Sequence, residues 1–279
     1  MNASKKIEEL LQNVGQLPTL PKAVIEIIRC IDDTDITVQD LVKLIGNDIG
    51  LSTSLLRAAN SARVSVHGKI ASINDAVMII GLKQIREIVC TVGVKESFPQ
   101  KESLGVDYID FWRHSVGVAI CAKELAHIAG VNPSIGYISG MLHDIGQLVV
   151  SMVAPNEFRE AMDYRTSHNC QDYEAEQIVL GMDHATIGAY LATQWGLPKV
   201  ICDAIEKHHM PDVAPTAIMA DLIHVSEILS HALEMGYIGH PIPPMSERSL
   251  SRLGINFSRL KPYLAQIECD HRNAIHMLN

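Results

Sequence analysis

Two adjacent side chains of types that bind metals, His143 and Asp144, lie within the otherwise apolar run from Met141 to Gly146. A carboxylate buried in such a run is costly unless a hydrogen-bond donor, a counter-charge or a metal satisfies it. The pair therefore predicts that other parts of the chain supply the missing partners.

Candidate partners are frequent in the second half of the chain, because five of the thirteen histidines occupy comparable places in successive helical segments. A helical bundle can hold a metal by projecting one or two ligands inward from each of several helices. Histidine nitrogens combined with carboxylate oxygens suit Zn, Fe, Mn or Ni. We predict a site for one or two divalent transition-metal ions, with Asp144 as the best candidate for a catalytic residue and with these ligands: His114, His143, Asp144, Asp221, His184, His208 and His209.

Helix geometry limits how these residues can meet. Adjacent residues on a helix diverge by about 100°, so His143 and Asp144 can converge on one metal only near a bend. Gly140 and Gly146 loosen the backbone on either side of the pair. Of the adjacent histidines at 208 and 209, one is expected to point inward while its neighbour closes the pocket or lies at its rim. The other histidines are interpreted as ordinary surface or core residues: His67, His127, His168, His224, His231, His240, His271 and His276.

The composition favours an all-α fold to carry such a site. Hydrophobic residues make up 47% of the chain and aromatic residues only 5%, whereas a β-sandwich would show more aromatic and β-branched alternation. Apolar spacing and capping signals predict helices over residues 22–31, 37–45, 51–61, 73–80, 81–94, 109–129, 134–153, 172–181, 184–195, 199–209 and 216–234.

A polar, turn-rich stretch from Phe98 to Gly105 separates short helices from longer ones. We therefore divide the chain into an N-terminal bundle of short helices (1–103), a helical core (104–235) and a C-terminal helical tail (236–279).

Charge and hydropathy exclude several classes of partner. The formal charge of −9 argues against a broad nucleic-acid surface, which needs clustered Lys and Arg. No apolar run approaches the roughly 18 to 20 residues that span a bilayer, and no secretory start is present. The six cysteines are widely spaced and are interpreted as reduced thiols. We expect a soluble, cytoplasmic protein.

The order His114, His143-Asp144, Asp221 resembles the HD superfamily of metal-dependent phosphohydrolases, whose ligands run His, His-Asp, Asp through a helical core. Further motifs make the chain similar to one branch of it, the HDOD domain, over roughly residues 15 to 225. These motifs are Leu17-Pro18-Thr19-Leu20-Pro21, Leu55-Leu56-Arg57-Ala58-Ala59-Asn60-Ser61, Ile73-Asn74-Asp75-Ala76 with Gly81-Leu82, Trp112-Arg113-His114-Ser115, Gly140-Met141-Leu142-His143-Asp144-Ile145-Gly146, and Trp195-Gly196-Leu197-Pro198 with His208-His209.

The resemblance implies an HD-like multi-helical core with an N-terminal short-helix bundle, acting as an output domain of bacterial signalling proteins. It places His114, His143, Asp144 and Asp221 at the HD ligand positions. The additional histidines, His184, His208 and His209, look like those of the HD-GYP phosphodiesterases, where a second metal is held. Metals in such a site polarise a phosphoryl oxygen and activate a water.

Two departures from the HD-GYP pattern argue against hydrolysis of cyclic di-guanylate. Gln147 stands where those enzymes carry a lysine, so it supplies no positive charge to a transition-state phosphate. The Gly-Tyr-Pro signature is also missing, because His209 is followed by Met210-Pro211.

Three hypotheses follow. The preferred one is a non-catalytic signalling module that binds a partner protein or a small nucleotide. The second is a metal-dependent phosphohydrolase acting on a phosphoester or a cyclic (di)nucleotide, and the third is a metal-free polar network of histidines. Arg57, Arg86 and Arg113 are the nearest phosphate-binding candidates by motif position, although surface or subdomain salt bridges are the preferred interpretation of each.

Overall fold

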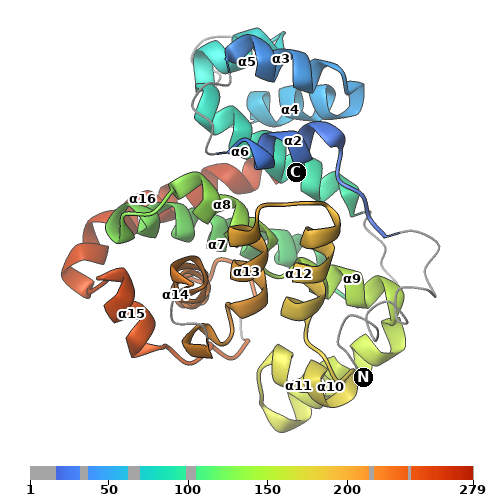
Figure 1. Cartoon of the computed structure of the whole chain (residues 1–279), viewed down its shortest axis with the longest axis vertical. Coiled ribbons are helices and arrows are strands. Elements are labelled where there is room, and N and C mark those ends of the chain that lie inside the picture. The colour runs from blue at the N-terminus through green and yellow to red at the C-terminus, as the bar shows by residue number, and fades with distance from the viewer. Residues whose placement is uncertain are drawn as a thin grey trace.

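The computed structural model describes residues 17–31, 37–61, 70–98, 105–213, 217–237 and 240–278. Within these ranges all regular structure is helical, which confirms the predicted all-α fold (Figure 1). None of the helices in the described ranges is long and apolar enough to span a bilayer.

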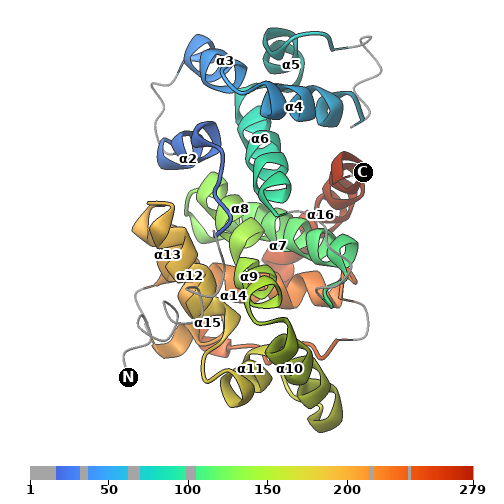
Figure 2. The ribbon, with the colours of Figure 1, turned by 90° about the vertical axis from the view of Figure 1, so that its right-hand side faces the viewer.

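Five helices form an N-terminal bundle at the top of Figure 1. Two of them begin at the predicted caps, since Thr37 and Asp40 form a reciprocal capping box and Ser72 accepts a hydrogen bond from the amide of Asp75. The last helix of the bundle runs down into the core, as Figure 2 shows. The five are α2 (Lys22–Arg29), α3 (Val38–Gly46), α4 (Ile49–Ser61), α5 (Ile73–Ile80) and α6 (Leu82–Ser97).

The core surrounds a central helix, α14, which is seen nearly end-on in Figure 1 and packs against helices that carry the predicted ligands. One core helix, α10, was not predicted. Its sequence is mostly polar, and the only side chains that it buries are those of Phe158 and Ala161. The core elements are α7 (Tyr108–Ala129), α8 (Pro133–Leu142), α9 (Ile145–Val153), α10 (Pro155–His168), α11 (Asp172–Val179), α12 (His184–Gln194), α13 (Lys199–Lys207), the short 3₁₀ turn η3 (Pro211–Val213) and α14 (Ile218–Ala232).

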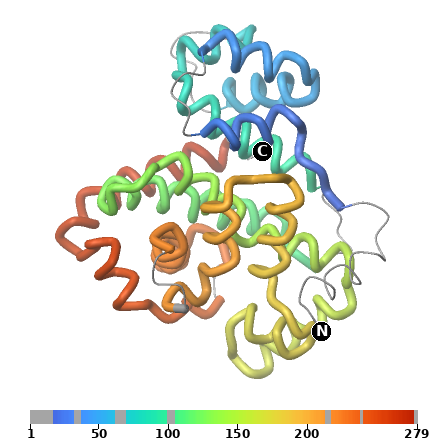
Figure 3. The backbone as a smooth tube through the Cα atoms, in the orientation of Figure 1, coloured from blue at the N-terminus to red at the C-terminus, as the bar shows by residue number. Residues whose placement is uncertain are grey.

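The C-terminal helices α15 (Glu247–Leu253) and α16 (Phe257–Leu278) fold back over the core. α15 packs against α14, and α16 packs against both α7 and α4. The chain therefore ends beside the N-terminal bundle (Figure 3). The subdomain division stays a prediction, and its first boundary, at residue 103, lies outside the described residues.

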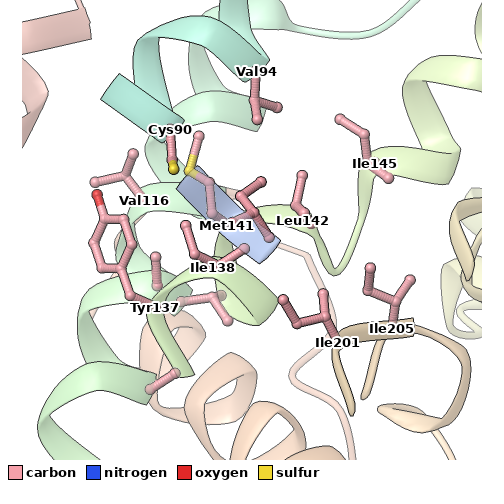
Figure 4. Close-up of a cluster of buried hydrophobic side chains, with 14 of the residues drawn as sticks. Cys90, Val94, Val116, Tyr137, Ile138, Met141, Leu142, Ile145, Ile201 and Ile205 are labelled. Atoms are coloured by element: carbon pink, nitrogen blue, oxygen red, sulfur yellow. The ribbon is translucent and has the colours of Figure 1, made fainter. Parts of the chain in front are cut away.

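Bundle and core share one apolar interior. Figure 4 shows Cys90 and Val94 of α6 facing Met141 and Leu142 of α8, with Ile201 of α13 beyond them. All of these side chains are buried, and burying a side chain of this size stabilises a fold by about 1.5 to 3 kcal/mol. The helices that carry the candidate ligands are thus held by continuous packing.

Candidate metal centre

The pair His143-Asp144 lies in a break between two helices. The predicted continuous helix over 134–153 is wrong, because α8 ends at Leu142 and α9 begins at Ile145. Asp144 leaves helical geometry, with φ −97° and ψ 7°. Since the backbone turns here, both side chains can face the same side, which a continuous helix would prevent.

Two glycines let the neighbouring helices approach this break. A Cβ added at Gly140 would lie 2.8 Å from the Cα of Ala119 on α7, and one added at Gly146 would overlap the carbonyl oxygen of His184. Only a residue without a side chain fits contacts of this kind. The glycines therefore draw α7 and α12, and the histidines that these helices carry, toward Asp144.

His143 and His208 share one hydrogen-bonding pattern. Nδ1 of His143 is 2.7 Å from the carbonyl oxygen of Gly140, and Nδ1 of His208 is 2.6 Å from that of Ile205. A carbonyl oxygen only accepts, so each Nδ1 carries the proton and each Nε2 keeps a lone pair. Both Nε2 atoms point toward Oδ1 of Asp144, at 3.4 and 3.7 Å, and neither has a hydrogen-bond partner.

A buried carboxylate orients His184, the first residue of α12. Oε2 of Glu176 lies 2.6 Å from Nδ1 of His184 and also accepts from its backbone amide at 2.7 Å. The opposite ring nitrogen, Nε2, lies 3.1 Å from Oδ1 of Asp144 and 2.8 Å from Nε2 of His209. A carboxylate on the far side of the ring is a common device for orienting a metal-binding histidine.

His114 of α7 and Glu227 of α14 complete the cluster. Neither ring nitrogen of His114 has a hydrogen-bond partner, although Nε2 lies 3.9 Å from Oδ2 of Asp144. Oε2 of Glu227 is likewise unpartnered and lies 3.9 Å from Nδ1 of His209. Buried polar atoms without partners are rare in native proteins, so their concentration at one point calls for a bound group.

The candidate ligand atoms, most of them unpartnered, converge in three overlapping groups, each with ligand atoms within 4.8 Å of one another. The donor set of imidazole nitrogens and carboxylate oxygens suits a divalent transition metal. The residues present therefore fit such an ion. The groups are Asp144 with His184, His208 and His209; His114 with His143 and Asp144; and His143 with His208 and Glu227.

Burial and neighbouring charges shift the pKa values of several residues in the cluster. Burial lowers the pKa of His114 well below its usual value and lowers that of His143 to about 4, so both rings are neutral. Burial alone would raise the pKa of Asp144, but the neighbouring His143 and His184 lower it well below its usual value. Burial and the charge of Asp144 raise the pKa of Glu227. A cation at the centre relieves this crowding of carboxylates.

Asp221 is the one predicted ligand that the structure does not bring into the cluster. Its carboxylate is buried but engaged elsewhere: Ser249 donates to Oδ1 at 2.6 Å, and Nε of Arg252 donates to Oδ2 at 2.7 Å. The carboxylate that α14 contributes instead is Glu227, six residues farther along. Asp221 thus fastens α15 to α14.

A small cavity of about 30 Å³ lies over the cluster. Gln147 spans its inner side, because Nε2 donates to Oδ2 of Asp144 at 3.2 Å and Oε1 accepts from the Tyr237 hydroxyl at 3.0 Å. The Tyr237 ring stacks on His114, with centroids 4.5 Å apart. The described residues that line this cavity include no Lys or Arg: Asp144, Gln147, Gln171, Asp172, Tyr173, His184, His209, Glu227, His231, Tyr237, His240, Pro241 and Pro243.

Several of these residues were not singled out in the sequence. His231 and His240 were interpreted as ordinary, yet both line the cavity. Of the adjacent pair, His208 lies in the interior and His209 forms part of the cavity wall, and both offer ligand atoms to one group. Glu176 and Glu227 had no distinguishing signal in the sequence. Asp172 and Glu174 share the short helix of Glu176, and Asp221 lies six residues before Glu227 in the same helix.

The sequence matches the HDOD domain over residues 17–211. The chain belongs to the HDOD family. Among proteins similar in sequence, an uncharacterized protein of Treponema pallidum (strain Nichols) is 28% identical over 214 residues, or 76% of this chain and 41% of that protein. Ribonuclease Y of Thermus thermophilus is 32% identical over 120 residues, or 43% of this chain and 16% of the enzyme. The chain thus spans less than half the length of these relatives.

Solved structures share the fold over nearly the whole chain. An HDOD domain protein of Geobacter sulfurreducens has a TM-score of 0.79 and 25% identity, with 97% of each chain covered. A Shewanella amazonensis SB2B protein described as a candidate phosphohydrolase has a TM-score of 0.77 and 27% identity, covering 97% of this chain and 98% of that one. The HDOD match ends before α14, so Glu227 lies outside it.

Proposed function

We propose that the chain is a regulatory module of bacterial signal transduction that holds a divalent transition metal in its HD-like core. The observation that carries the proposal is the set of buried, unpartnered ligand atoms on six residues of the cluster. Hydrogen bonds to backbone carbonyls and to Glu176 already orient three of the histidines. Ligands fixed in this way bind a metal with little further ordering.

The arrangement favours two ion positions over one. Asp144 belongs to two of the three ligand groups, with Oδ1 facing His184 and Oδ2 facing His114. A carboxylate can offer one oxygen to each of two ions. Zn, Fe, Mn and Ni all suit this donor set.

The cavity favours regulation over turnover. About 30 Å³ holds roughly one water molecule, and the ring of Tyr237, which lines this cavity, stacks on His114. Gln147 carries no charge, and the guanidinium of Arg165 is engaged by two residues that line the cavity, Asp172 at 3.1 Å and Nδ1 of His240 at 2.8 Å. A phosphoester would find no free cation among the described lining residues to stabilise its transition state.

The alternative function is a metal-dependent phosphohydrolase. It is favoured by the opening of the cluster onto a cavity and by the likeness to the Shewanella amazonensis protein. A divalent metal bound here would supply Lewis acidity toward a phosphoryl oxygen. Tyr237 would have to swing away from His114 to admit the substrate. The binding partner, a signalling protein or a small nucleotide, stays a prediction.

Metal content and turnover, measured together, separate these functions. Protein purified without chelators would be analysed for Zn, Fe, Mn and Ni, then assayed with bis-p-nitrophenyl phosphate, p-nitrophenyl phosphate and cyclic di-guanylate. We expect at least one ion per chain, little metal in D144A, and no turnover above that of D144A. A control variant, E206Q, removes an exposed carboxylate of α13 and should keep its metal.

Each departure has a clear meaning. Turnover by the wild type that D144A loses would favour the phosphohydrolase and refute the regulatory module. Protein that binds no metal even after supplementation would refute the metal site and leave the polar network of histidines.

A further inference from the structure

A second and larger pocket lies at the junction of the N-terminal bundle, the core and the C-terminal helix. Its volume is about 380 Å³, within the range of small-molecule sites. Its walls come from α6, α7, α8 and α16, and it shares no lining residue with the cavity over the metal cluster. The lining residues are Gln84, Glu87, Ile88, Ile120, Lys123, Tyr137, Gln266, Asp270, Asn273 and Ala274.

The floor of this pocket contains a buried carboxylate with a free oxygen. Glu87 is only 5% exposed. Its Oε2 accepts from Nζ of Lys123 at 2.7 Å, but its Oε1 is buried and has no hydrogen-bond partner. Leaving a charged acceptor unpaired is costly. The ion pair with Lys123 therefore satisfies Oε2 of Glu87, and Oε1 can still accept a hydrogen bond from a donor.

The rest of the wall defines what kind of donor fits. Asp270 of α16 adds a second carboxylate, so with Glu87 and Lys123 the pocket carries a net charge of about −1. Ile88 and Ile120 supply an apolar surface beside it. The combination of an acidic floor and an apolar wall matches a molecule with a cationic head and a short hydrocarbon stem.

We propose that this pocket binds a small organic cation whose ammonium or amidinium group donates to Oε1 of Glu87. The hydrocarbon stem of the ligand lies along Ile88 and Ile120. The side-chain amides of Gln84 and Asn273 contact a polar group at the end of the ligand opposite the cation. Such a ligand touches the bundle through α6 and the core through α7 and α8. These same core helices lead to His114 and His143, so occupancy of the pocket is placed to influence the metal centre.

The test uses the full-length protein and two probes of equal length, 1,4-diaminobutane and the uncharged 1,4-butanediol. Isothermal titration calorimetry should show one diamine site with a dissociation constant of 1 mM or tighter, on the order expected for a few well-placed polar contacts. The diol should not bind. E87Q should weaken the diamine at least tenfold, whereas E206Q removes a carboxylate from the exposed face of α13 and should bind as the wild type does.

Two results would overturn the proposal. Equal binding of diamine and diol would mean that the pocket does not recognise the positive charge, and equal binding to E87Q and wild type would mean attraction to the acidic surface as a whole. A second variant keeps the test decisive if E87Q does not fold. N273L fills the mouth while leaving the pair of Glu87 and Lys123 intact, and it should abolish diamine binding; retained binding would refute the site.

Discussion

Gly146, in the first turn of α9, marks the closest approach of α9 to α12. A Cβ added there would overlap the carbonyl oxygen of His184 and lie 2.8 Å from both the carbonyl carbon of His184 and the amide nitrogen of Gly188. These are backbone atoms and cannot turn aside. Non-bonded carbon atoms rest about 3.5 to 4.0 Å apart, so the contact with the carbonyl carbon alone requires a shift of about 0.7 Å, and the overlap with the carbonyl oxygen makes G146A push the two helices apart by more than this.

Two opposing effects set the size of the result. Overpacking costs about 1 to 3 kcal/mol, and replacing glycine by alanine within a helix gains up to about 1 kcal/mol. We expect G146A to lower the free energy of unfolding by about 1 to 2 kcal/mol, or the Tm by about 2 to 8 °C. The shift also separates Asp144 from His184, now 3.1 Å apart, and should weaken metal binding about 10- to 100-fold.

Urea denaturation followed by circular dichroism gives the stability, and competition with a chromophoric chelator gives the metal affinity. G50A is the matched control, because a Cβ at Gly50 of α4 meets only Oδ1 of Asp48, at 3.4 Å. It should be at least as stable as the wild type, with unchanged metal affinity. The role given to Gly146 would be refuted if G146A kept the stability and metal affinity of the wild type. It would also be refuted if G50A lost as much stability and metal affinity as G146A does.

Three further predictions concern single side chains. R252L leaves the buried Asp221 without its counter-charge and should lower the free energy of unfolding by about 2 to 4 kcal/mol, less than for a fully buried pair because Arg252 is partly solvated. Metal affinity should not change, and a changed affinity would contradict the placement of Asp221 outside the metal centre. E227Q keeps the shape of Glu227 and should weaken metal binding at least tenfold by chelator competition, whereas unchanged affinity would remove that residue from the centre. Hydrogen bonds from Thr37 lower the pKa of Asp40, so T37A should raise that pKa in an NMR titration. Because the folded pKa is the lower one, this contribution to stability is present above about pH 4 and lost as the pH falls through the pKa of Asp40; an unshifted pKa in T37A would contradict the assignment.

Helix starts were predictable where one local signal decides them. Thr37 and Asp40 form their capping box within four residues, and Ser72 caps α5 without help from the rest of the fold. The break at Asp144 has no such signal, because no proline or glycine separates His143 from Ile145. It depends on packing against α7 and α12, which the sequence does not display.

The candidate site was predictable in kind but not in every member. Residues such as His143 stand out because a polar side chain in an apolar helix needs a partner. The choice between Asp221 and Glu227 could not be made in this way. The two lie six residues apart on α14 and so point about 120° away from each other, and α14 is buried on nearly all sides. Only the tertiary structure shows which side faces the histidines.

Residues outside regular helices were the hardest to predict. Tyr237 and His240 reach the cavity from the irregular segment after α14. Apolar periodicity, the main signal for helices, says nothing about such segments. Their role became visible only when the ring of Tyr237 was found stacked on His114.

Anomalous X-ray diffraction at the absorption edges of Mn, Fe, Ni and Zn tests the central claim most directly, using crystals of protein purified without chelators. We predict one or two anomalous peaks among the three ligand groups, each within about 2.0 to 2.3 Å of imidazole nitrogens and a carboxylate oxygen of its group. The contradicting result would come from crystals of metal-supplemented protein. If these side chains keep the same positions and no anomalous peak appears at any edge, the chain has no metal centre.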